Sequence, residues 1–110
     1  GPLHDPLAVV ELDELYAELG LTEKRGPLLA RAPGHRFIVE RRADLALATG
    51  NPAETIRLLT ATPWPREHQR YVRTELYQKA KAALGEPDAE VPEFLNEDNL
   101  ARFGAYWPDR

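Results

Sequence analysis

The feature that most constrains this chain is a corner at Gly50-Asn51-Pro52, where a helix stop is followed at once by a helix start. Glycine favours the left-handed conformation that ends many helices, asparagine is a good N-cap, and proline suits the first helical position. Glu54 then falls at the N3 position of a capping-box-like pattern. Each such cap contributes roughly 1 kcal/mol. The segments on either side are therefore predicted to form two helices that fold back as an antiparallel hairpin.

Helix signals also precede this corner. Asp5-Pro6 begins a first helix and Gly20 ends it; a turn from Thr22 and a brief helix over residues 27–32 follow, and then a helix over residues 35–49. Apolar residues at helical spacing predict which side chains are buried. In the first helix these are Val9, Leu12, Leu15, Tyr16 and Leu19, whereas the acids Glu11, Asp13, Glu14 and Glu18 lie mostly outside that stripe. In the next two helices they are Leu28, Leu29, Ile38, Val39, Leu45 and Ala46, with Ala43 allowing a close approach and Leu47 lying off the main face.

After the corner, Ala53, Ile56 and Leu59 are predicted to pack back on the preceding helix. The prolines of Pro63-Trp64-Pro65 predict an extended clip with Trp64 anchored in the core. A long helix over residues 66–84 buries Val72, Leu76, Ala80 and Ala83, an acidic connector over residues 86–92 is flexible, and a last helix begins near Asn96. Its apolar residues Leu100, Phe103 and Trp107 predict that this tail docks on the body.

These signals predict an all-α fold, a small single-domain helical bundle of four to five main helices built around the hairpin at residues 50–52. The 110 residues suit one domain, over residues 6–110. Residues 1–5 are taken as a cleavage scar or a disordered start, since Gly1-Pro2 is typical of a processed tag. No apolar run approaches the length of a membrane span and no leader precedes the domain, so a cytoplasmic, bacterial protein with no membrane contact is expected.

Composition excludes several kinds of chemistry. The chain has no cysteine and no serine, which rules out thiolate metal sites, disulfides and serine or cysteine nucleophiles. His4, His35 and His68 show no metal-ligand spacing, and a capping or solvent-exposed role is expected for each. Adjacent carboxylates on a helix point in different directions and do not share a proton. We therefore expect no enzyme activity, no cofactor and no metal site.

Charge is divided unevenly along the chain. Residues 1–20 carry five acids and no bases, residues 21–85 carry twelve bases and six acids, and residues 86–110 carry seven acids and two bases. A basic middle between acidic ends is compatible with neutralisation inside one fold, with end-to-middle self-association, or with an anionic partner.

Two known families share parts of the corner segment. Residues 46–59, AxxxGNPAETIRLL, resemble the turn and second helix of a tetratricopeptide-like helical hairpin, and the resemblance extends over residues 43–63. Thr55 stands where that family usually has a small alanine. The spacing of Leu45, Ala46, Gly50, Thr55, Ile56 and Leu59 is also similar to the DNA-binding helix-turn-helix. The first resemblance implies a role in protein interaction, and the second implies a nucleic-acid-binding unit.

The candidate partner-binding residues form a basic and aromatic stripe at helical spacing: Arg66, Arg70, Arg73, Tyr77 and Lys81. Arginine suits bidentate contacts to carboxylate or phosphate, and tyrosine adds a stacking surface. We expect a non-catalytic protein–protein interaction domain that binds an acidic protein surface or a second copy of itself. The alternative is a nucleic-acid-binding domain, helix-turn-helix-like or RNA-associated, that acts through the basic middle. A purely structural interpretation is that these charges have partners inside the chain, such as Glu67 and Glu86.

Overall fold

A computed structural model describes residues 5–32, 35–62 and 70–92, and these residues form five helices and no strand. The helices are α1 (Pro6–Glu18), α2 (Thr22–Leu29), α3 (Arg36–Ala48), α4 (Pro52–Thr60) and α5 (Arg70–Ala83). The all-α class and the predicted number of main helices are confirmed. In the described part of the chain no helix is long and apolar enough to cross a membrane. The expected Trp64 clip and the last helix fall outside the described residues.

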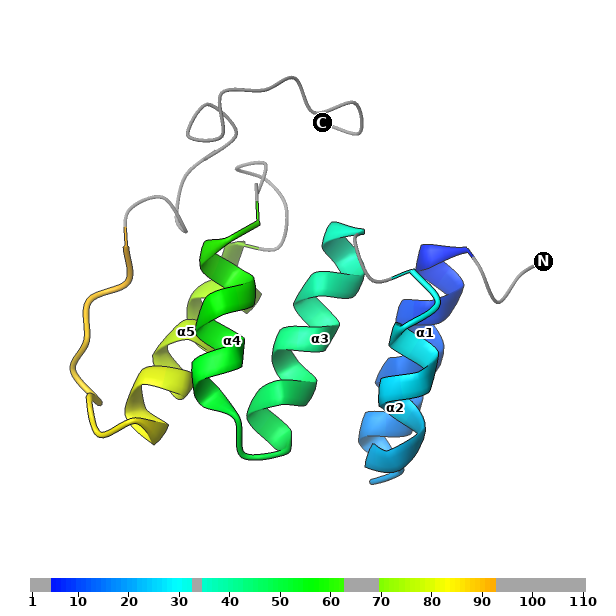
Figure 1. Cartoon of the computed structure of the whole chain (residues 1–110), viewed down its shortest axis with the longest axis horizontal. Helices are drawn as coiled ribbons and strands as arrows, with labels where there is room; N and C mark the ends of the chain where they lie inside the picture. The colour runs from blue at the N-terminus through cyan, green and yellow to red at the C-terminus, as the bar shows by residue number, and fades with distance from the viewer. Residues whose placement is uncertain (1–4, 33–34, 63–69, 93–110) are drawn as a thin grey trace, which may run out of the picture.

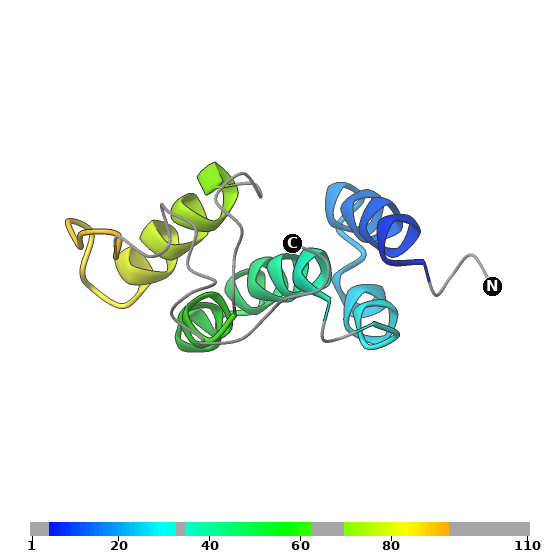
Figure 2. The same ribbon diagram turned by 90° about the horizontal axis from the view of Figure 1, so that it is seen from above.

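Helix α3 lies at the centre of the arrangement (Figure 1). It packs against each of the other four helices, whereas α1 packs mainly on α2 and α3, and α5 mainly on α3 and α4. Seen from above, α1 and α5 lie to one side of α3, and α2 and α4 lie to the other (Figure 2). The described residues therefore form two helical hairpins, α1–α2 and α3–α4, with α5 added after the second.

The helix ends follow the sequence closely. The Asp5 carboxylate accepts a hydrogen bond from the Leu7 backbone N–H at 3.0 Å and caps α1. His35 caps α3 by accepting from the Phe37 N–H at 3.3 Å. At the corner, Gly50 has a φ of +81°, and the Asn51 side chain accepts from the Glu54 N–H. The predicted hairpin at residues 50–52 is confirmed, and local capping chemistry is its cause.

Helix α2 differs from the prediction, because one helix runs through Pro27 where a turn and a restart were expected. Proline removes one intrahelical hydrogen bond and disfavours an α conformation at the residue before it. That residue is Gly26, which has no Cβ to clash with the proline ring. Arg25, Leu28 and Leu29 are all buried on one side of α2, so tertiary contacts hold both halves of the helix in one line.

The core consists of two apolar clusters on opposite sides of α3. Val9, Leu28, Leu29 and Ile38 form the first, between α1, α2 and α3. The second joins α3, α4 and α5 and contains Val39, Ala43, Leu58, Leu59, Leu76 and Tyr77. Leu45 packs against the first cluster and Leu47 against the second. Helix α3 is therefore covered on two sides, in agreement with the position of Leu47 off the main predicted face, since neighbouring residues of a helix point to different sides.

The rotation of the outer helices about their axes was predicted less well. Val9 of α1 is buried as expected, but Leu15 and Leu19 are exposed and Asp13 is fully buried, contrary to the prediction. In α5, Val72 and Ala83 are exposed, although Leu76 and Ala80 are buried as expected. Ala53 of α4 is exposed, and Thr55 and Leu58 are buried in its place. An outer helix contacts its neighbours along one side only, and ion pairing and packing, beyond periodicity, select that side.

Thr55 ties the two helices of the central hairpin together. Its side chain is fully buried, and its hydroxyl donates a hydrogen bond of 2.8 Å to the backbone carbonyl of Ala43. Ala43 is itself fully buried and has only a methyl group, so the two backbones approach closely there. The threonine that departs from the tetratricopeptide-like pattern thus bonds directly across the hairpin.

We predict that Thr55→Val destabilises the protein by about 1–2 kcal/mol, because a buried hydrogen bond is lost with little change in volume. The matched control is Thr49→Val, since Thr49 is exposed and bonds only to carbonyls of its own helix. That change is expected to stay within about 0.5 kcal/mol. Urea unfolding followed by circular dichroism measures both. Equal losses for the two variants would show that the cross-helix bond contributes nothing.

Candidate partner-binding surface

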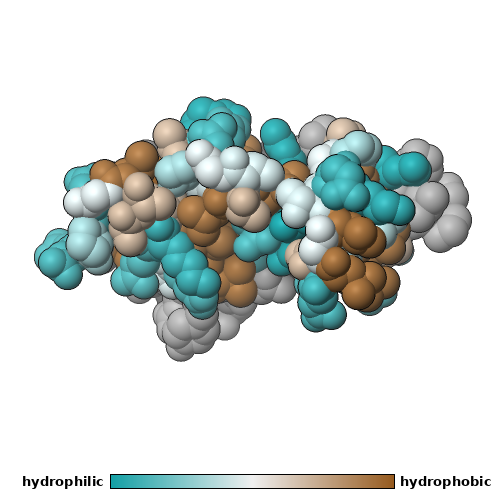
Figure 3. Space-filling view, turned by 90° about the horizontal axis from the view of Figure 1, so that it is seen from below, coloured by the Kyte–Doolittle hydropathy of each residue, from teal (hydrophilic) through white to brown (hydrophobic). Residues whose placement is uncertain are grey.

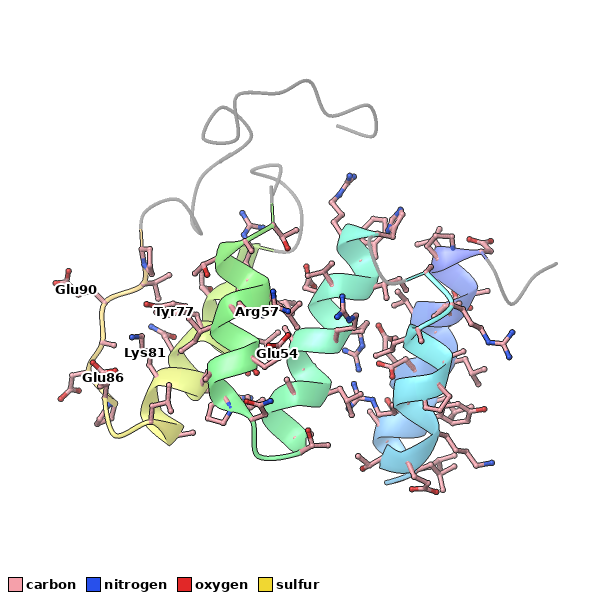
Figure 4. All side chains as sticks on the ribbon, in the orientation of Figure 1. Glu54, Arg57, Tyr77, Lys81, Glu86 and Glu90 are labelled. Carbon is pink, nitrogen blue, oxygen red and sulfur yellow. The ribbon has the colours of Figure 1, made fainter. Side chains whose placement is uncertain are left out.

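The predicted basic stripe does not form a continuous exposed surface. Arg73 is fully buried, and Tyr77 is buried in the second core cluster. Arg70 begins α5 and Arg66 lies outside the described residues. Figure 4 shows Tyr77 and Lys81 on α5, facing the segment that carries Glu86. Partner binding by this stripe stays a prediction, but Arg73 and Tyr77 take part in the packing of α5.

The reason is a small rotation of α5. Residues 73, 76, 77 and 80 form its buried side, at the i, i+3, i+4, i+7 spacing of one helix face. The sequence favoured a neighbouring stripe because Val72 is more apolar than arginine or tyrosine. Both of those side chains, however, have long apolar portions that pack well when the polar end finds a partner. The predicted functional face and the true core face therefore overlap.

Lys81, the half-buried end of the stripe, already has a partner in the chain. Its ammonium lies 3.3 Å from a carboxylate oxygen of Glu86 and 5.8 Å from the centre of the Tyr77 ring. Val91, further along the connector, packs against the second core cluster. The expectation that Glu86 neutralises this stripe from within the chain agrees with that contact. Residues 86–92 contain no helix, and their predicted flexibility stays a prediction.

The most organised charged group of the described residues lies elsewhere, between α1, α2 and α3. The Arg25 guanidinium donates two hydrogen bonds to the Asp13 carboxylate, at 2.7 and 2.9 Å, and one to Asp44 at 2.8 Å. Arg41 donates to Asp13 at 2.7 Å and lies 3.7 Å from Asp44. Each arginine thus contacts both carboxylates, and the four side chains form a closed ionic network. Asp13 and Arg25 are almost completely buried.

Asp13 and Arg25 were not selected from the sequence, because charged side chains are normally expected at the surface and these two are buried as a pair. Burial alone lowers the pKa of the Arg25 guanidinium, but hydrogen bonds to Asp13 and Asp44, and their negative charges, raise it above its ordinary value overall. The charged form is therefore retained inside the fold. A signal was present: Asp13 follows the buried Val9 by four residues, and Arg25 precedes Leu28 and Leu29 by three and four. These polar residues occupy buried positions of the helical repeat.

A groove of about 340 Å³ opens next to this network. Helices α1 and α5 form its walls and α3 forms its floor, on the side where α1 and α5 lie in Figure 2. Its apolar and charged lining residues come from all three helices: Val10, Glu14, Phe37, Glu40, Arg41, Asp44, Val72 and Leu76. Val72 is 41 % exposed, a large fraction for an apolar side chain. We take this groove as the candidate partner-binding surface.

A second groove of about 340 Å³ lies on the opposite side of α3, between α2 and α4. Small residues line much of it, among them Gly26, Ala30 and Ala46. Its two charged residues are Arg42 and Glu54, and Glu54 is held in an ion pair within α4. The first groove, with the exposed Val72 on one wall and a fixed charge network beside it, has the more distinctive chemistry.

The structure also bears on the helix-turn-helix resemblance. Helices α3 and α4 run side by side in opposite directions (Figure 1), whereas a helix-turn-helix places its two helices at about 90–120°. Arg57 is the one basic residue of α4, and its guanidinium pairs with the Glu54 carboxylate one turn earlier (Figure 4). In a helix-turn-helix, α4 would be the helix that contacts DNA bases, but its one basic side chain, Arg57, is already paired with Glu54 of the same helix.

Among the described residues, no three histidine, aspartate or glutamate side chains are grouped so that they could hold a metal ion. His35 acts as a helix cap and stacks on Phe37 at 5.0 Å between ring centres. His4 and His68 lie outside the described residues.

In comparisons with known proteins, no protein-family model, no curated protein and no solved structure matches this chain. The tetratricopeptide-like and helix-turn-helix patterns therefore remain local similarities of one segment.

We predict that Arg25→Met destabilises the protein by about 3–5 kcal/mol, because it leaves the buried Asp13 carboxylate with one of its two cations. Arg57→Met is the control, since its ion pair is exposed and is expected to leave the free energy of unfolding nearly unchanged. Thermal and urea unfolding measure both. A double-mutant cycle of Arg25→Met with Asp13→Asn measures the interaction energy between the two side chains. If the two losses of stability were strictly additive, the ionic network would be contradicted.

A second prediction concerns the pKa of Glu54, which forms an ion pair with Arg57. A hydrogen bond from Arg57 and the positive charges of Arg57 and Arg42 lower the pKa of the Glu54 carboxyl. A lowered pKa in the folded state adds stability above the unfolded pKa, and this is lost as the pH falls through the folded value. Arg57→Ala is expected to move the Glu54 pKa up toward its ordinary value. Titration of the side-chain carboxyl by NMR measures the shift, and an unchanged pKa would contradict the pairing in solution.

Proposed function

We propose that this chain is a non-catalytic protein-interaction domain that binds a segment of another protein in the groove between α1, α3 and α5. The observation that carries the proposal is the exposed apolar side of Val72, which faces the groove beside Leu76, Val10 and Phe37. Apolar pockets with a few fixed polar groups are the usual form of a binding site. A volume of about 340 Å³ suits the insertion of a few partner side chains.

The ionic network supports the proposal because it sets the position of one groove wall. Asp13 belongs to α1 and Arg41 and Asp44 belong to α3, so their contacts fix α1 against the groove floor. The opposite wall is held by the second core cluster, through Leu76. A groove whose walls are fixed before the partner arrives loses less conformational entropy on binding.

The charges in the groove suggest the chemistry of the bound segment. Arg41 and Asp44 are engaged with each other and with Asp13 and Arg25. Glu14 is exposed at the groove edge on α1. A partner segment that combines apolar residues with a lysine or arginine would fill the apolar walls and meet this carboxylate. The acidic partner predicted from the basic stripe has less support, because two residues of that stripe are buried.

The groove is tested with a peptide library displayed on phage and selected on the full chain. We expect recovered peptides to contain apolar and basic residues and to bind Val72→Glu at least about tenfold more weakly, a loss of about 1.4 kcal/mol. Leu84→Glu is the matched control: Leu84 is 47 % exposed just after α5 and does not line the groove. Fluorescence anisotropy with purified peptides measures the affinities.

The alternative function, nucleic-acid binding, is tested in parallel with the peptides. Duplex DNA and single-stranded RNA are titrated at low salt alongside the peptides. Affinity for nucleic acid that falls steeply with salt and is unaffected by Val72→Glu would favour the alternative. A selection that yields only peptides insensitive to Val72→Glu would overturn the groove as the binding surface.

A further inference from the structure

The outward face of α1 and its C-cap carry three leucines with large exposed fractions that belong to neither core cluster. Leu7 is 57 % exposed, Leu15 is 47 % exposed and Leu19 is 62 % exposed. With Glu11 and Glu18 they follow one another at i, i+4, i+8, i+11 and i+12, so all five lie on one face of the helix. Apolar surface also reaches solvent on the α1–α2 side of the molecule in Figure 3. This set of residues is called the α1 outer face.

The charge on the α1 outer face is of one sign. Glu11 and Glu18 are both exposed, and residues 1–20 contain no lysine or arginine. A face that alternates leucine with glutamate matches an amphipathic helix whose apolar stripe is flanked by basic residues. We propose that the α1 outer face docks a basic amphipathic helix of another protein.

Two other occupants fit the charges less well. A second copy placed symmetrically would bring the glutamates of one α1 against those of the other. Much of the base-rich middle of the described chain is also already engaged, since Arg25 and Arg41 belong to the ionic network and Lys79 and Lys81 pair with Glu75 and Glu86. An anionic lipid surface would repel the glutamates.

This inference goes beyond the proposed groove function and is independent of it. None of the five residues of the α1 outer face lines the groove. The variants that test each surface are therefore different, and either can fail while the other stands.

The probe is a synthetic helical peptide with leucine at the a and d positions of each heptad and lysine at the flanking positions, and a glutamate-flanked version is the control peptide. Fluorescence anisotropy is measured with the full chain at two salt concentrations. We expect the lysine peptide to bind, the glutamate peptide not to bind, and Leu15→Gln with Leu19→Gln to weaken binding about tenfold or more. Glu11→Gln with Glu18→Gln should weaken binding at low salt and flatten its salt dependence.

Leu84→Gln is the matched variant, because Leu84 has the same 47 % exposure as Leu15 and directly follows α5, which lies at the other end of the row of helices from α1 (Figure 1). It should leave the affinity unchanged. Because all substituted side chains are exposed, circular dichroism is expected to show an intact fold for each variant. Binding that the leucine double variant leaves unchanged, or equal binding of the two peptides, would overturn the proposal. So would a dimer of the full chain that Leu15→Gln with Leu19→Gln dissociates, since a second copy would then cover this face.

Discussion

The packing of the first hairpin against α3 depends on one buried ion pair, Arg25 with Asp13. A charge removed from water is costly unless a close partner and further hydrogen bonds replace its hydration. Here the guanidinium forms a bidentate contact with one carboxylate and reaches Asp44 as well, while Arg41 supplies the second cation for Asp13. Because these contacts join α1 and α2 to α3, the network helps to fix the position of the first hairpin on α3.

This placement has consequences for the surface. When α1 turns Asp13 inward, it turns Leu15 and Leu19 outward, and both leucines become part of an exposed acidic face. The same rotation puts Val10 and Glu14 on the wall of the groove above α3. One buried interaction thus accounts both for the groove and for the α1 outer face. Apolar residues that periodicity assigned to the core remain available for contacts with other molecules.

Several basic side chains from the middle of the sequence are buried or paired with acids of the same chain in the fold. Along the sequence, the basic middle suggested a surface for acidic proteins or nucleic acid. In the fold, Arg25 and Arg73 are buried, and the exposed Lys79 and Arg57 pair with acids on their own helices. These bases contribute to internal cohesion, whereas four of the five acids of residues 1–20 are exposed and only Asp13 is buried. This distribution of charge is why the partners proposed for both surfaces are basic.

The sequence by itself determined the helices and the central corner, because caps and stops act within a few residues: Asp5, Gly50 and Asn51 adopt the roles that their chemistry predicts. Only the tertiary structure decided how the outer helices are rotated and therefore where the candidate sites lie. Helical spacing indicates that a stripe is buried, but a long side chain such as Arg73 joins that stripe or leaves it according to what the neighbouring helices offer. That choice depends on contacts between residues far apart in the chain, which local patterns do not contain.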